Sequence, residues 1–202
     1  MVRLFFILTL SLFMLSADKI VPIRLAYNIN ENSELYLLGS TNVNNFRCDC
    51  KDKFQASVLE GDINPSTRLI QFKNAKLRIK TKLLSCRNNV MNRDLHKALK
   101  AEEFPYIIVD LINAQPLHNE KDMQPGKVYS YNINSIMHIA GVSKAQTIQV
   151  KLLRSKETMF KLTASKDIPM SEYKIHPRTP FNIIKIDDII TIHFELLVTA
   201  GK

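Results

Sequence analysis

In the stretch AKLRIKTKLLSC, residues 75–86, positions 75–83 alternate strictly between apolar or small side chains and cations. The cations occupy the even positions Lys76, Arg78, Lys80 and Lys82. Successive side chains of a β-strand point to opposite faces, whereas a helix would scatter these cations around its axis. The stretch therefore predicts a strand with one wet face and one apolar face. That apolar face could meet a packed core or a bound ligand.

The same period of two recurs along the chain. It is clearest in residues 52–60, 106–112, 147–153, 158–164 and 188–198, and residues 33–50 and 127–141 read as further strands. Short turn signals such as GDINPST separate several of them. One-sided alternation is typical of antiparallel sheets, and closure of such a sheet removes its exposed edges. We predict an all-β fold, an antiparallel β-barrel of about eight strands.

One segment has helical spacing instead. Met91, Leu95, Ala98 and Leu99 have helical spacing within residues 89–105. Asn92 is the candidate N-cap, and Pro105 prevents continuation. This predicts one short α-helix of about ten residues packed against the barrel. The proline-containing segment 168–181 predicts a loop or a short helical turn.

Residues 1–17 have the pattern of a secretory signal peptide. Arg3 precedes the apolar run LFFILTLSLFML, and cleavage is expected after Ala17. Residues 18–202 would then form one barrel domain in the periplasm or outside the cell. An uncleaved membrane anchor is the alternative, although the run is shorter than the roughly 20 residues of a transmembrane helix.

The chain is basic, with a formal net charge of +9. Such a charge favours anionic partners, and the expected one is peripheral contact with an anionic membrane. The cations are spread along strand faces, so an ordinary solvated surface is the plain alternative. Export argues against nucleic acid as a partner.

The three cysteines are Cys48, Cys50 and Cys86. An odd count allows one disulfide and one remaining thiol, which fits an oxidising compartment. Cys48 and Cys50 lie on the same side of one strand, so either can pair with Cys86. A three-thiolate metal site lacks a fourth Cys or His at ligand spacing, and we predict no metal site.

Motifs for catalysis are absent from the sequence. The five histidines have no metal-ligand spacing, and there is no Gly-x-Ser-x-Gly elbow or phosphate-binding glycine loop. We therefore expect a binding protein and not an enzyme, with no cofactor. An enzyme acting on a lipid head group would need a polar cluster at the barrel mouth, for which Tyr131, His138 and His176 are loose candidates. A small barrel can enclose one ligand, but a core filled by its own side chains is also possible.

Three blocks, in this order, resemble a known family. They are GSTNVNNFRCDC (39–50), MNRDLHKALKAEEFPYIIVDL (91–111) and MHIAGVSKAQTIQVKL (137–152). With the tail at 168–198, they are similar to the YceI-like, polyisoprenoid-binding proteins, most of all to the cysteine-bearing secreted forms from Bacteroidetes. The resemblance implies a lipocalin-like barrel with a helix against it and an isoprenoid lipid or isoprenoid quinone inside. It also implies a Cys48–Cys86 disulfide.

Individual positions match the family pattern or depart from it. The matches are Met137 and Ile139 on one strand, Gly141, Val142 and Lys144 in its turn, and Phe104, Pro105, Ile107 and Val109 after the helix. Lys174 stands where a glycine is usual after Glu172 and Tyr173, and a glycine near the start of the third block is missing. Both departures fall outside the strand pattern.

We predict that an apolar isoprenoid chain is bound by inward side chains, each buried methylene contributing about 0.8 kcal/mol. The residues are Phe54, Leu77, Ile79, Ile107, Val109, Met137, Ile139, Phe160, Phe194 and Leu196. This assignment assumes that the cations of residues 76–82 lie outside. The alternative is a ligand-free structural or stress-response envelope protein with a filled core. A monomer and a homodimer are both compatible with the sequence.

Overall fold

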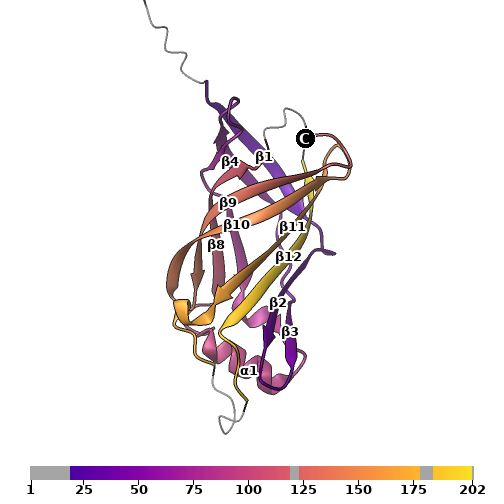
Figure 1. The fold of residues 1–202 in the computed structure, drawn as a ribbon. Helices are drawn as coiled ribbons and strands as arrows, with labels where there is room; N and C mark the ends of the chain where they lie inside the picture. The colour runs from indigo at the N-terminus through magenta and orange to yellow at the C-terminus, as the bar shows by residue number, and fades with distance from the viewer. Residues whose placement is uncertain (1–18, 119–122, 178–183, 202) are drawn as a thin grey trace, which may run out of the picture.

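The computed structural model describes residues 19–118, 123–177 and 184–201 (Figure 1). The predicted signal peptide lies outside these residues. The strands are β1 (Val21–Ile29), β2 (Glu34–Ser40), β3 (Asn45–Cys50), β4 (Ser57–Ile63), β5 (Ile70–Phe72), β6 (Lys76–Lys80), β7 (Leu84–Ser85), β8 (Tyr106–Pro116), β9 (Val128–Ile139), β10 (Val142–Arg154), β11 (Met159–Pro169) and β12 (Ile189–Ala200). The α-helix is α1 (Asn89–Ala98), and η1 (Thr81–Leu83) and η2 (Met170–Tyr173) are 3₁₀ turns.

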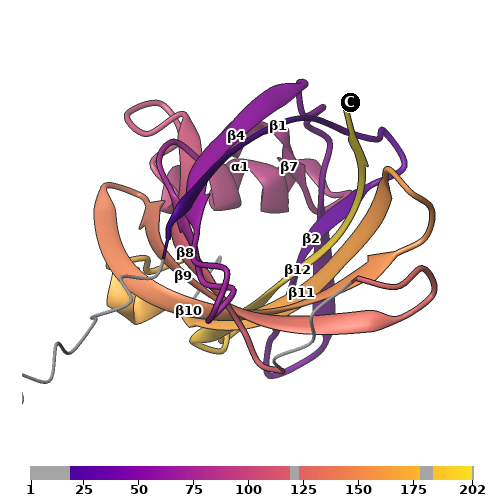
Figure 2. The same cartoon turned by 90° about the horizontal axis from the view of Figure 1, so that it is seen from above.

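Eight strands close into an antiparallel barrel, in the order β1-β4-β5-β8-β9-β10-β11-β12. The last strand returns to the first, with Tyr27 opposite Ala200 and Ile29 opposite Val198. Figure 2 shows this ring of strands from above. The all-β, lipocalin-like barrel of about eight strands with one helix is thereby confirmed.

The remaining strands extend the wall at the end where α1 lies (Figure 1). There β2 pairs with residues 191–195 of β12, β3 pairs with β2, β7 pairs with β3, and β6 pairs with β8. Among the described residues, β3 pairs with neither β1 nor β4. The wall is therefore interrupted between β1 and β3.

The opening stretch folds as β6 with its cations outside, as predicted. Lys76, Arg78 and Lys80 are exposed, Leu77 is half-buried and Ile79 is buried. The strand is shorter than predicted, because η1 begins at Thr81 and turns the chain. The buried Thr81 hydroxyl donates to the carbonyl of Phe104 at 3.0 Å, which holds this turn against the segment after α1.

Three of the four cations in this stretch have carboxylate partners. Their Nζ atoms lie 2.9 Å from Asp110 for Lys76, 3.5 Å from Asp52 for Lys80 and 2.7 Å from Glu102 for Lys82. The face is thus a largely neutralised outer surface. It offers little net charge to an anionic membrane.

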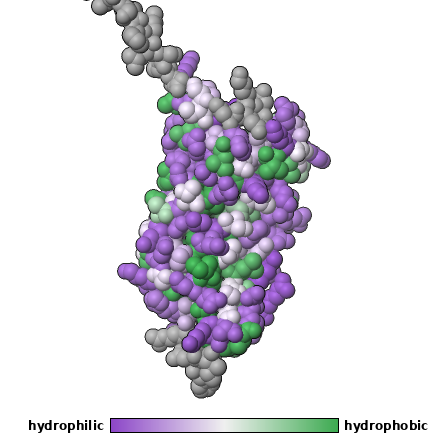
Figure 3. Space-filling model, viewed as in Figure 1, coloured by the Kyte–Doolittle hydropathy of each residue, from purple (hydrophilic) through white to green (hydrophobic). Residues whose placement is uncertain are grey.

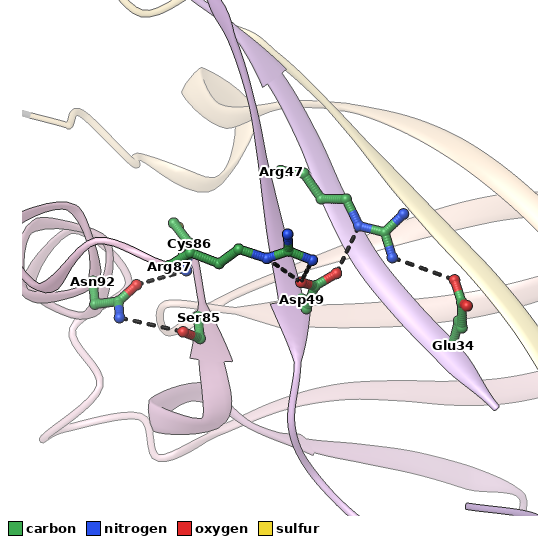
Figure 4. Close-up of polar contacts among 7 residues, drawn as sticks. All are labelled: Glu34, Arg47, Asp49, Ser85, Cys86, Arg87 and Asn92. Atoms are coloured by element: carbon green, nitrogen blue, oxygen red, sulfur yellow. Dashed lines mark hydrogen bonds and ion pairs between the residues drawn. The ribbon is translucent and has the colours of Figure 1, made fainter. Parts of the chain in front are cut away.

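The helix begins earlier than predicted. Its N-cap is Asn88, whose Oδ1 accepts hydrogen bonds from the backbone of Val90 and Met91 at 2.9 and 3.1 Å, so the prediction of Asn92 as the cap was wrong. Asn92 lies in the helix, where Oδ1 accepts from the Cys86 amide at 2.6 Å (Figure 4). The asparagine side chain therefore fastens α1 to the end of β7.

The disulfide joins Cys48 to Cys86, as the resemblance implied, and leaves Cys50 as a half-buried thiol. This pairing removes two ligands from any three-thiolate metal site. No helix among the described residues has the length and hydrophobicity needed to cross a bilayer.

Candidate ligand-binding site

Nine of the ten predicted lining residues belong to one apolar cluster. Six are buried, namely Ile79, Ile107, Val109, Met137, Ile139 and Phe194, and three are half-buried and packed against them, namely Phe54, Leu77 and Leu196. The tenth, Phe160, is half-buried on β11 opposite Val198. The structure thus places the predicted residues on the inner side of the wall.

Strand register brings these residues into rows across the barrel. Leu77, Val109 and Met137 stand side by side on β6, β8 and β9. Across the barrel, Phe194 of β12 lies between Ala164 of β11 and Leu35 of β2. Side chains in register share a face, so these rows are parts of one inner surface.

Sequence reasoning missed several inner residues. The buried members of the same cluster include Leu35, Leu37, Ile148, Val150, Ala164 and Ile192. The alternation of these residues was visible in the sequence, but alternation alone does not distinguish them from the ten residues predicted to line the site. Tyr173, which is fully buried, carried no such signal because it lies in η2 and not in a strand.

Burial differs between the two halves of the interior. Near α1 and η2 the inner residues are almost fully buried, as Met137, Ile168 and Tyr173 are. Further along β10, β11 and β12, the row Leu152, Leu162 and Leu196 is only half-buried. These side chains face the inside of a closed wall, so the surface they still expose lies in the interior or at its mouth. This half of the inner surface is less tightly packed than the half near α1.

The few polar groups of the packed half satisfy one another. The buried Ser135 hydroxyl donates to the backbone carbonyl of Gln146 at 3.2 Å, and the Gln146 amide donates to the Tyr173 hydroxyl at 3.4 Å. Burial raises the pKa of Tyr173, so its hydroxyl stays protonated at neutral pH. This end of the barrel therefore closes with hydrogen-bonded polar groups.

A cleft of about 780 Å³ lies where the wall is interrupted, and both faces of the sheet contribute to it. Ile29 and Leu35 reach it from the inner face, because they stand opposite Val198 and Phe194. Arg47 and Asp49 line it from the outer face of β3, since they alternate with the inward Cys48. The cleft thus brings polar residues of the outer face next to two buried apolar residues of the inner face.

Asp49 is the centre of an ion-pair network on the outer side of this cleft (Figure 4). Its carboxylate accepts from Arg47 Nε at 2.6 Å and from Arg87 Nη2 at 3.1 Å, while Arg47 Nη2 lies 3.3 Å from Glu34. Burial opposes ionisation of Asp49, but the hydrogen bonds and charges of the two arginines outweigh it and lower its pKa. The guanidinium of Arg47 also lies 3.6 Å from the Tyr36 ring centroid.

The loose catalytic candidates are not brought together. Tyr131 has the inward parity of β9, whereas His138 has the outward parity of the same strand and contacts the Ser143 hydroxyl at 2.7 Å. His176 is exposed after η2. Among residues 19–118, 123–177 and 184–201, no three His, Cys, Asp or Glu side chains are grouped to hold a metal ion.

The fold and the apolar inner surface define a small antiparallel β-barrel of the lipocalin-like class. The structure is similar to a polyisoprenoid-binding domain from Saccharophagus degradans implicated in plant cell wall breakdown, with a TM-score of 0.64, 14% identity, and coverage of 88% of this chain and 99% of that one. It is also similar to Burkholderia cenocepacia BcnA, with a TM-score of 0.58, 12% identity, and coverage of 84% and 99%.

The YCEI protein of Campylobacter jejuni has a TM-score of 0.50, 16% identity, and coverage of 71% of this chain and 80% of its own. No family model and no curated protein matches the sequence. At these identities the likeness concerns the fold, and the YceI-like fold implied by the three sequence blocks is confirmed.

Proposed function

We propose that this protein binds a polyisoprenoid lipid or isoprenoid quinone, with the apolar chain held inside the barrel. The observation that carries the proposal is the half-buried inner row Leu152, Leu162 and Leu196 beyond a fully packed end. Apolar surface kept accessible inside a closed wall gains free energy when a chain covers it, about 25 cal/mol per Å². The similar domain from Saccharophagus degradans, described as polyisoprenoid-binding, supports the same ligand class.

The test is extraction of the purified protein with organic solvent, followed by mass spectrometry. A co-purifying prenyl lipid, or uptake of an added one, supports the proposal. Repeatedly empty extracts with no uptake would favour the second candidate, a ligand-free structural envelope protein with a filled core. The packed half of the interior is the observation in favour of that alternative.

Neighbouring leucines on β10 offer a matched pair of variants. Leu152 faces inward opposite Leu162, whereas Leu153 faces outward opposite Lys161, and both are half-buried. Leu152→Gln places an amide against the apolar chain, at a cost of about 1–3 kcal/mol, and should weaken lipid retention about tenfold. Leu153→Gln should leave retention unchanged. Equal effects of both would exclude binding along this row.

We also propose that the protein is exported and contacts anionic membranes peripherally. The Cys48–Cys86 disulfide supports an oxidising compartment. Arg93, Lys97 and Lys100 are three exposed cations suited to membrane contact, at spacings of four and three residues along one side of α1 and its end. They line a groove of about 660 Å³. Figure 3 shows a mostly polar face with scattered apolar patches, which suits electrostatic contact better than insertion.

Cosedimentation with vesicles containing phosphatidylglycerol tests this contact. Arg93→Ala, Lys97→Ala and Lys100→Ala together should reduce binding at least tenfold, because each cation near an anionic surface contributes about 1 kcal/mol. The same number of charges removed at Lys19, Lys151 and Lys156 is the control. Equal losses would show a dependence on net charge alone, and cell fractionation would test export separately.

A further inference from the structure

The cleft between β1 and β3 coincides with a gap in the hydrogen-bond ladder of β12. Strand β1 pairs with β12 from Val198 onward, and β2 pairs with it up to Glu195. Between them, Asn30 donates its amide to the Leu197 carbonyl at 2.7 Å, and Ser33 Oγ accepts from the Leu197 amide at 2.9 Å. The β1–β2 turn therefore replaces a strand at this level of the wall.

Leu196 lies directly behind this gap. It has inward parity on β12, it is half-buried, and among the described residues no strand residue of β1 or β2 stands opposite it. On its other side it is in register with Leu162, which is in register with Leu152. This row of leucines thus begins at the level of the β1–β2 turn, whose residues line the cleft.

Phe54 lies at the junction of the cleft and the interior. It lines the cleft, packs against the apolar core and belongs to the strand-free segment between β3 and β4. A side chain outside a ladder can change its position with less loss of hydrogen bonding than one within a ladder. Phe54 is therefore placed to contact the chain where it enters.

The charges that line the cleft are balanced. The cations are Arg47, Lys51, Lys53 and Arg87, and the carboxylates are Glu31, Glu34, Asp49 and Asp52. Arg47 and Arg87 already share Asp49, and Lys53 Nζ lies 2.8 Å from Glu31. A phosphate would meet as many carboxylates as cations and would compete with existing ion pairs. Asn28, Asn32 and Ser33, which also line the cleft, suit hydrogen bonds to an uncharged group.

We propose that this cleft is the entrance and head-group site of the barrel, and that it selects an isoprenoid with an uncharged polar head, such as a quinone or an alcohol, over a prenyl phosphate. The proposal rests on the proposed binding of an isoprenoid chain. The head group lies between the β1–β2 turn and β3. The chain passes Phe54 and continues along Leu196, Leu162 and Leu152.

Two single-tryptophan variants can locate the head group, because the protein itself has no tryptophan. Phe54→Trp places the fluorophore at the cleft, and Tyr131→Trp places it on β9, across the barrel. A two-isoprene ubiquinone is the probe, since its head group quenches tryptophan at short range. We expect at least threefold stronger quenching in Phe54→Trp.

The outcomes separate the cleft from the proposed function. Stronger quenching in Tyr131→Trp would overturn the cleft as the head-group site and leave chain binding intact. Quenching in neither variant, together with no bound quinone by native mass spectrometry, would overturn both. Unfolding curves of the two variants establish that each is folded before the comparison.

Competition against the bound quinone tests the choice of head group. Geranylgeraniol should displace it at a concentration at least tenfold lower than geranylgeranyl phosphate. Glu34→Gln, at a side chain that is 60% exposed, gives the cleft a net positive charge and should reduce this preference. Glu102→Gln removes the carboxylate of the exposed Lys82–Glu102 ion pair and is the control, which should leave the preference unchanged. Equal or better displacement by the phosphate would overturn selection for an uncharged head.

Discussion

The ring of Phe104 lies directly against Gly141, so closely that a Cβ at Gly141 would be 2.5 Å from the ring. Phe104 follows α1, and Gly141 forms the turn between β9 and β10 with a φ of +84°. The contact joins two of the three sequence blocks that resemble the YceI-like proteins. It seats the segment after the helix against the barrel.

Gly141→Ala should lower the free energy of unfolding by about 2–4 kcal/mol. The left-handed backbone accounts for about 1–2 kcal/mol of this, and overpacking against the ring for the rest. Gly126 provides the control, because its φ is +79° but no atom lies within 4 Å of an added Cβ. Gly126→Ala should lose only the backbone part, as measured by urea denaturation. Equal losses would mean that the ring has no effect.

Lys174→Gly should stabilise the protein. Lys174 has a φ of 56° and ends η2, at the position where the resembling family has a glycine. The left-handed conformation costs a lysine about 1 kcal/mol, whereas a glycine adopts it without strain. A glycine also has more conformational entropy in the unfolded state, which offsets part of this gain in stability. We expect a net gain of about 0.5 kcal/mol by thermal and urea denaturation. Lys174→Ala should give no gain, and an equal gain would point to the loss of the charge instead.

Removal of the Cys48–Cys86 disulfide should cost about 4 kcal/mol in the chain-entropy treatment of a closed loop of this size. Cys86→Ser should therefore shift the urea midpoint strongly, and wild-type protein under reducing conditions should behave in the same way. Cys50→Ser should have a much smaller effect. Thiol labelling of the denatured, unreduced protein should modify one cysteine, and labelling of three would contradict the disulfide.

Asp49 should make the protein sensitive to acid. The pKa of Asp49 is lowered in the folded state, because Arg47 and Arg87 outweigh the effect of burial. Its contribution to stability is thus present above its unfolded pKa, about 4, and is lost as the pH falls through the lower folded value. Asp49→Asn should be less stable than wild type at pH 7, and the difference should shrink towards pH 2.5. A difference that is independent of pH would exclude this ionisation as its cause.

The outward cations and inward apolar residues of β6 could be predicted from the sequence, because the alternation of side chains is a local property of extended backbone. The same reasoning explains why eight of the ten predicted lining residues, all of them in strands, join one core cluster. Phe54 was also predicted in a strand, but it joins the cluster from the strand-free segment between β3 and β4. It could not place the helix cap, since Asn88 and Asn92 have the same chemistry and only the path of the chain from β7 distinguishes them.

The sequence by itself determined most of the strands, though not β1 or β5, and with them the apolar faces and the class of fold, because each follows from residues near one another in the chain. Tertiary structure decided that Arg87 meets Asp49, and that Cys48 and not Cys50 pairs with Cys86, a choice that strand parity left open. It also decided that β1 and β2 share β12 and leave a cleft between them. These features depend on barrel closure and strand register, which bring distant residues together through contacts that no local pattern encodes.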